Sequence, residues 1–229
     1  MFLYKDKYGL IAWHRAAVGG SLEALETLWI WAKELGQNTG KFLLAETGEG
    51  YTAFLLAASE NHVEILKTLW VWAEETQLYP NELKKNLFLD KDNYWYIAWH
   101  VAALGGSLEA LETLWKWVRE LERNTDELLL TETGNGYIAF QLAAWENHVE
   151  MLKTLWVWAE ETQLNPNELK KKLFVVKDQK RFIAWHRSAI EGTLSALETL
   201  WNWLVKWKHR LSVAISNWGW KYCLPIGNR

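Results

Sequence analysis

A short phrase that occurs five times along the chain constrains the fold more than any other feature. Each copy joins isoleucine or threonine to alanine and an aromatic residue, beginning at Ile11, Thr52, Ile97, Ile138 and Ile183. The alanines of the phrase lie at positions 12, 53, 98, 139 and 184, so their spacing alternates between 41 and 45 residues. The unit of repetition is therefore a doublet of 86 residues. Such a repeat predicts stacked units, because one unit cannot bury its apolar face without a neighbour.

Each unit is expected to begin with a turn and two helices. In the first unit the turn falls at residues 6–9, and a short helix follows from Ala12 to Ala17. Gly19-Gly20 predicts that the helix ends at a residue with the left-handed backbone conformation, which we call the left-handed stop. Ser21 is a suitable cap for a second helix over residues 22–35, whose leucines and Trp29 share one face.

The left-handed stop is expected in every unit, although its residue changes. Glycine occupies the position in the first, third and fifth units, while Asn61 and Asn147 occupy it in the second and fourth. Asparagine is the residue other than glycine that best tolerates this conformation. The substitution therefore predicts the same backbone.

A third helix is expected to close each unit. Asn165-Pro166 is a helix start signal, with asparagine as the cap and proline at the first helical position, and Glu168 is placed to reach back to the cap. Pro80 begins the matching helix and Thr125 a shorter one. We expect Lys170–Lys172 to face solvent. The residues expected to be buried are Leu169, Leu173 and Phe174.

Tryptophan recurs in pairs separated by one residue, and ten of the 18 tryptophans belong to these five pairs. Residues two apart point in different directions on a helix, so both members cannot share one face. We expect Trp70 and its equivalents to face the first helix of the unit. We expect Trp72 and its equivalents to be partly covered by the third helix, since five exposed indoles would form an adhesive ridge.

The predicted array covers residues 1–204, with units starting near residues 5, 46, 91, 132 and 177. The pattern fades after Trp203, so residues 205–229 form a divergent C-terminal tail. The tail holds Cys223 and a basic stretch at 206–210 that could touch an acidic partner or a membrane surface. Neither end has the polar capping repeat typical of solenoids, so the pattern is compatible with a piece of a longer array or with an irregular gene model.

Composition limits the class of protein. The net charge of -3 gives no overall basic field, so nucleic-acid binding is not expected. No apolar run approaches the 18 residues of a membrane span, and the N-terminus lacks the layout of a signal peptide. A single cysteine excludes an internal disulfide framework and favours a cytoplasmic location.

The order of turn glycine, the repeated phrase, a pair of small residues, glycine and a leucine-rich helix resembles the ankyrin repeat, over about residues 5–204. The resemblance implies an all-α helical solenoid of about five repeats with short turn fingers. Two features depart from it. The period exceeds the usual 33 residues, which an added third helix would explain, and the turn glycine is replaced by Trp95 and Arg181.

Catalytic and metal-binding patterns are weak. His14, His100 and His186 lie 86 residues apart, whereas metal ligands must converge, so we expect structural hydrogen bonds from them. The adjacent acids Glu74-Glu75 and Glu160-Glu161 point in different directions and do not form an acid–base pair. We therefore expect neither an enzyme nor a cofactor or metal.

Positions that vary while the scaffold repeats are the better guide to function. Residues 65–88 and 151–174 agree at 21 of 24 positions, whereas the turn tips and the ends of the first helices differ. Exposed aromatic and arginine side chains commonly anchor partners. The candidate protein-binding residues are Lys7, Tyr8, Glu49, Tyr94, Trp95, Asn135, Trp145, Lys180 and Arg181.

Two functions are compatible with these patterns. The first is a protein–protein interaction scaffold that binds its partner on the concave surface of turns and first helices. The second is a structural segment of a longer array that self-associates through uncapped ends. Neutral variation at surface turns would also produce the differences between units.

Overall fold

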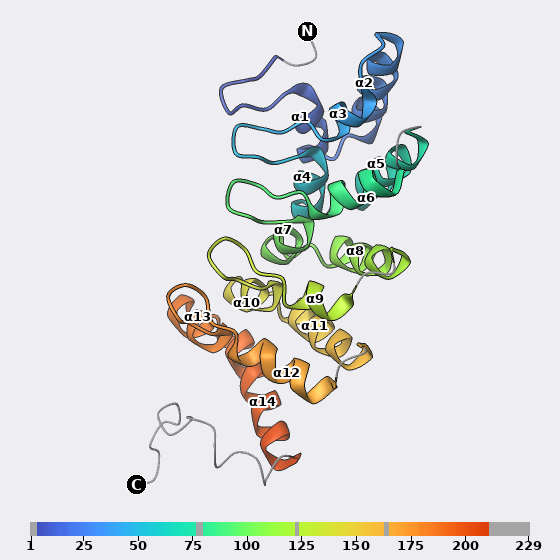
Figure 1. Ribbon diagram of the computed structural model, residues 1–229. Coiled ribbons are helices and arrows are strands. Elements are labelled where there is room, and N and C mark those ends of the chain that lie inside the picture. Colours follow the sequence, from blue (N-terminus) through green and yellow to red (C-terminus); the bar gives the residue numbers. More distant parts are fainter. Residues whose placement is uncertain (1–3, 77–79, 122–123, 163–164, 211–229) are drawn as a thin grey trace.

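The computed structural model describes residues 4–76, 80–121, 124–162 and 165–210 of the 229-residue chain. Within these ranges the protein is all-helical, and its 14 helices form five successive units (Figure 1). An isolated antiparallel β-bridge joins Glu46 to Thr52, and it is the single β-bridge among the described residues. The all-α class expected from the sequence is confirmed.

Within the described residues, every unit contains a pair of helices, and the first four units add a third. The first helices are α1 (Ala12–Val18), α4 (Ala53–Ser59), α7 (Ala98–Gly105), α10 (Ala139–Trp145) and α13 (Ala184–Glu191). The second helices are α2 (Leu22–Glu34), α5 (Val63–Glu75), α8 (Leu108–Glu120), α11 (Val149–Glu161) and α14 (Leu194–Arg210). The third helices are α3 (Thr39–Leu43), α6 (Pro80–Leu89), α9 (Thr125–Leu129) and α12 (Pro166–Val175).

The units stack in chain order. Each first helix packs against the first helix of the next unit, from α1 through α4, α7 and α10 to α13. The turns that precede these helices project together on one side of the row, and the second helices lie on the other side (Figure 1). The alanine pairs of the first helices are mostly buried, as at Ala57-Ala58 and Ala102-Ala103, which lets neighbouring backbones approach closely.

The left-handed stop occurs as predicted. Gly106 and Gly192 have φ of 72° and 71°, and Asn61 and Asn147 have φ of 59° and 63°. The asparagines also have a role that the sequence did not reveal. Asn61 Oδ1 accepts a hydrogen bond (3.0 Å) from the backbone N–H of Ala110, in the first turn of α8 of the next unit.

Asn147 repeats this contact with the N–H of Ala196 in α14, also at 3.0 Å. The first N–H groups of a helix have no partner within the helix. Each asparagine therefore ends one helix and caps another, which ties two units together.

The tryptophan pairs join neighbouring units. The first member of each pair packs on the aromatic residue of its own first helix, as predicted; Trp70, for example, lies 6.3 Å from Phe54 between ring centroids. The second member stacks nearly parallel on the first member of the preceding unit, with centroids 4.3–4.7 Å apart and planes within 8°. The four stacked pairs are Trp29–Trp72, Trp70–Trp117, Trp115–Trp158 and Trp156–Trp203.

This stacking corrects the expected role of the third helix. The second tryptophan is covered chiefly by the preceding unit, and the third helix instead covers the first tryptophan, as where Phe174 lies 5.2 Å from Trp156. The stacks also explain why two members are more exposed than the rest. Trp31 in the first unit and Trp201 in the last are 49% and 40% exposed.

The start signal of α12 is confirmed, because Asn165 caps the helix and Pro166 is its first residue. Leu169, Leu173 and Phe174 are buried as expected. The expectation for Lys170 was wrong. Its side chain is buried, because the amine Nζ pairs with Glu160 of α11 and lies over the indole of Trp156, 4.7 Å from the ring centroid.

The end of the chain differs partly from the expected boundary. α14 continues to Arg210, so the helix includes the first residues of the predicted tail. Residues 211–229, with Cys223, lie outside the described residues, as do residues 1–3.

Candidate protein-binding surface

The turn in front of each first helix is closed by the side chain of its first residue. Asp92 Oδ1 accepts hydrogen bonds from the N–H groups of Tyr94 and Tyr96, at 2.9 and 2.8 Å. Thr47 Oγ1 performs the same task for Glu49 and Tyr51 in the second unit. The residue alternates between aspartate and threonine, at positions 6, 47, 92, 133 and 178. A short side chain with a hydrogen-bond acceptor is common at the first position of a turn, because it can accept from the backbone N–H two residues later.

Neighbouring turns are joined through their backbones. The N–H of Asn93 donates to Glu49 O at 3.0 Å, that of Gly134 to Tyr94 O at 2.9 Å, and that of Gln179 to Asn135 O at 3.0 Å. Each of these bonds joins one unit to the next. The turns therefore form a continuous row (Figure 1), and a ligand on one turn would lie beside the next.

Eight of the nine predicted binding residues lie exposed on these turns. They are Lys7, Tyr8, Glu49, Tyr94, Trp95, Asn135, Lys180 and Arg181. The backbone contacts bring the tips of the second to fifth units side by side. These eight residues define what we call the turn surface.

Trp145, at the end of α10, has a different setting from the other eight. Its ring is half-buried, 5.5 Å from the ring of Tyr137 and 4.8 Å from the guanidinium of Arg187. The side chain therefore packs over residues of its own fold, and its main contacts are internal. Ile190, at the equivalent end of α13, is 57% exposed.

Tyr94 and Trp95 form an adjacent pair of exposed aromatic side chains on the turn surface. They are 56% and 58% exposed, and Lys91 Nζ lies 4.9 Å from the Trp95 ring centroid. Trp95 has φ of 65°, the left-handed conformation that Gly9, Gly50 and Gly136 adopt in other units. A residue with a Cβ atom is strained there by roughly 1–2 kcal/mol. The turn thus has an exposed tryptophan at a position where glycine would adopt the same backbone conformation with less strain.

Arg181 occupies the same turn position in the fifth unit, with φ of 64°. Its side chain is exposed. The replacement of glycine thus leaves the turn backbone unchanged in both units, and it adds one aromatic and one cationic side chain to the turn surface.

The histidines of the repeated phrase make structural hydrogen bonds, as expected. His100 Nδ1 accepts from the N–H of Ile97 at 3.3 Å, and Nε2 lies 2.8 Å from Thr131 O, just after the third helix of the same unit. Nε2 therefore carries the proton. Burial lowers the pKa of His100 to about 4, and burial also lowers the pKa of His14, which makes the same pair of contacts.

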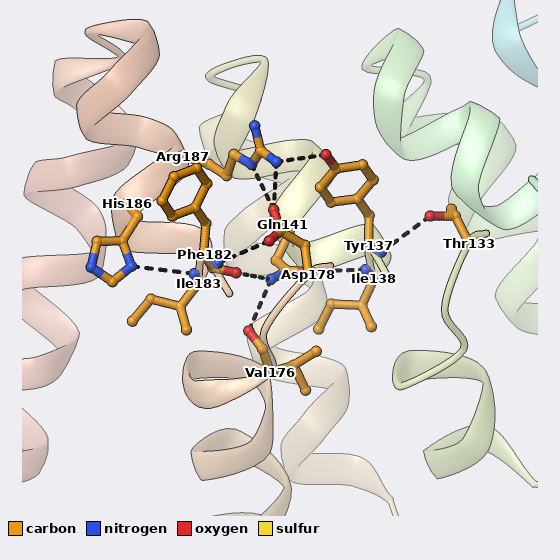
Figure 2. A network of polar contacts seen from close by, with 10 residues as sticks. All are labelled: Thr133, Tyr137, Ile138, Gln141, Val176, Asp178, Phe182, Ile183, His186 and Arg187. Atoms are coloured by element: carbon orange, nitrogen blue, oxygen red, sulfur yellow. Dashed lines mark hydrogen bonds and ion pairs between the residues drawn. The ribbon is translucent and has the colours of Figure 1, made fainter. Parts of the chain in front are cut away.

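Glutamine replaces this histidine in the fourth unit and makes equivalent contacts. Gln141 Oε1 accepts from the N–H of Ile138 at 3.0 Å, and its Nε2 donates to Val176 O at 2.9 Å (Figure 2). The side chain at this repeat position therefore needs one hydrogen-bond acceptor and one hydrogen-bond donor. It does not need to be titratable.

A buried ion pair lies beneath the turn of the fifth unit. Arg187 of α13, 6% exposed, donates from Nε and Nη2 to Asp178 Oδ2 at 2.9 and 2.5 Å. Its Nη2 also donates to Tyr137 Oη at 2.6 Å (Figure 2). The rings of Tyr137, Trp145 and Phe182 surround the guanidinium at 4.8–5.1 Å. These contacts compensate the cost of burying the two charges.

Among the described residues no group of three or more histidine, cysteine, aspartate or glutamate side chains is placed to hold a metal ion. The acidic pairs take part in ion pairs of the fold, since Glu74 contacts Lys84 at 3.1 Å and Glu160 contacts Lys170. No helix in the described part of the chain is long and apolar enough to cross a membrane.

Comparison with protein-family models and with curated proteins found no match for this chain. The fold and the repeats define a tryptophan-rich, all-helical repeat protein. Its specific features are the turn surface and the indole stacks.

Proposed function

We propose that the chain is a non-enzymatic scaffold, an ankyrin-like helical solenoid of the cytoplasm, that binds a protein partner on its turn surface. The observation that carries this proposal is the exposed pair Tyr94-Trp95 at a turn where glycine would relieve strain. Residues held in strained conformations tend to occur at functional sites. Tryptophan and tyrosine are also the residues that most often dominate protein interfaces.

The setting of the pair supports binding of a protein. The turn is fixed by the two hydrogen bonds to Asp92 and by backbone bonds to both neighbouring turns, so little ordering is needed on binding. The surface mixes aromatic side chains with both signs of charge, because Lys91 lies over Trp95 and the exposed Glu49 belongs to the neighbouring turn, which is joined to this one through Asn93. This composition is typical of a protein interface and lacks the uniform basic charge that nucleic acids require.

The proposal is tested by affinity capture with the variant Tyr94→Ala/Trp95→Gly. Glycine at position 95 restores the residue of the other turns, so the fold is preserved. The matched control is Val71→Ala/Val157→Ala, which removes two exposed apolar side chains from α5 and α11 on the opposite side. Proteins captured by wild type and control should be lost from the turn variant. Equal capture by all three forms would refute the assignment.

Self-association is a second candidate that one observation favours. Trp201 packs on Trp185, and no tryptophan from a following unit stacks on it within the described residues. A second copy could supply such a ring. Light scattering of wild type and Trp201→Ala across a concentration series decides this, because end-to-end association predicts concentration-dependent growth that the variant abolishes. A constant monomer mass for wild type would exclude it.

A further inference from the structure

The third unit holds a buried carboxylate that has no counter-charge among the described residues. Asp92 is 3% exposed, and its Oδ1 closes the turn; its Oδ2 makes no close hydrogen bond among the described residues, although the Tyr51 hydroxyl interacts with the carboxylate. No described cation forms an ion pair with it, since nearby Lys91 lies over Trp95. A buried charge without a counter-charge is costly, so this oxygen calls for an explanation.

The turn itself does not require the charge. Thr47 and Thr133 close the equivalent turns with a neutral hydroxyl, so an acceptor is sufficient. In the first and fifth units aspartate takes this place, and its second oxygen binds an arginine of the following helix. These pairs are Asp6–Arg15 and Asp178–Arg187.

The third unit keeps the aspartate and lacks the arginine. Val101 occupies the position of Arg187, and Ser59 that of Trp145, which covers the guanidinium in the fifth unit. The aromatic neighbours are retained, because Tyr51 and Tyr96 stand where Tyr137 and Phe182 bracket Arg187. Both tyrosines are half-buried.

The hydroxyl of Tyr51 interacts with the Asp92 carboxylate but does not neutralise its charge. Burial raises the pKa of Tyr51 to about 12, and the negative charge of Asp92 and a side-chain hydrogen bond to it raise the pKa further. A neutral hydroxyl supplies no positive charge. The third unit therefore has the aspartate and the two aromatic rings that surround Arg187 in the fifth unit, but it has no arginine of its own at this place.

We infer that Asp92, with Tyr51 and Tyr96, is a binding site for an arginine side chain presented by the protein partner. The inference rests on the proposed function and specifies the partner's chemistry at the same turn, since Tyr94 and Trp95 belong to the loop that Asp92 closes. A guanidinium would donate to Asp92 Oδ2 and lie between the two tyrosine rings. Arginine suits this geometry better than lysine, because its planar group stacks on rings while it donates hydrogen bonds.

The first test is NMR titration of the intact ¹⁵N-labelled chain with N-acetyl-arginine amide. The reporter signals are the amides of Tyr94 and Tyr96, which donate to Asp92. The arginine probe should shift them saturably, and the neutral citrulline analogue should not. Equal shifts with citrulline or lysine analogues, or no saturable shift with arginine, would overturn the inference.

Two variants identify the site. Asp92→Asn keeps Oδ1 for the turn but loses the charge, and its affinity for the probe should fall at least about tenfold. Val101→Arg supplies the missing guanidinium from the chain itself, so it should abolish probe binding and raise the melting temperature. That rise should disappear in the double variant with Asp92→Asn. Unchanged probe binding in Val101→Arg would refute the site.

The outcome is separable from that of the proposed function. If the turn variant loses its captured proteins while the arginine probe fails, only the arginine site is wrong. If the probe binds at Asp92 while the turn variant captures the same proteins as wild type, only the broader proposal is wrong.

Discussion

Acidification should destabilise the protein through His100, and the structure gives both the sign and the size of the effect. The neutral ring donates from Nε2 to Thr131 O and accepts at Nδ1 from the N–H of Ile97. A second proton would sit on Nδ1 and face that N–H. The protonated ring would therefore lose a hydrogen bond and carry a buried charge.

The pKa of His100 is lowered from 6.5 to about 4, chiefly by burial. Below pH 6.5 the unfolded chain binds a proton that the folded chain does not, so the free energy of unfolding falls as pH drops toward 4. The full shift corresponds to roughly 3 kcal/mol, and most of it, about 2–3 kcal/mol, should be lost between pH 7.5 and 4.5.

The variant His100→Gln separates this effect from other titrating groups. Gln141 shows that glutamine makes both hydrogen bonds at this repeat position, so the variant should fold normally at neutral pH. Urea unfolding of both proteins at pH 7.5 and 4.5 measures the difference. Wild type should lose roughly 2 kcal/mol more than the variant on acidification. An equal loss in the two proteins would refute the reasoning.

Three further perturbations test the packing described above. Trp95→Gly should raise the free energy of unfolding by about 1 kcal/mol, because it relieves left-handed strain; a lower melting temperature would contradict this. Trp117→Ala should cost roughly 3–5 kcal/mol in urea unfolding, because Trp70 loses its stacked neighbour, whereas Trp31→Ala should cost clearly less. Asn61→Gly keeps the helix stop but removes the cap on Ala110, so a loss of about 1 kcal/mol is expected, and an unchanged unfolding midpoint would argue against the cap.

The sequence alone determined the features that depend on neighbours along the chain. The repeat period, the helix stops at Asn61 and Asn147, the start of α12 at Pro166 and the inward face of Trp70 all follow from local backbone preferences and helical periodicity. Eight of the nine candidate binding residues could be assigned to exposed turns in the same way, because glycine, asparagine and aspartate between helical segments indicate turns.

Contacts between units were decided by the tertiary structure. The spacing within one helix could not show that Trp72 stacks on Trp29 of the preceding unit, or that Asn61 caps α8 of the following one. The same holds for Trp145, which covers Arg187 forty-two positions later in the chain. These partners depend on the tilt and separation of adjacent units, which arise from the packing of whole helices and leave no periodic mark within a single unit.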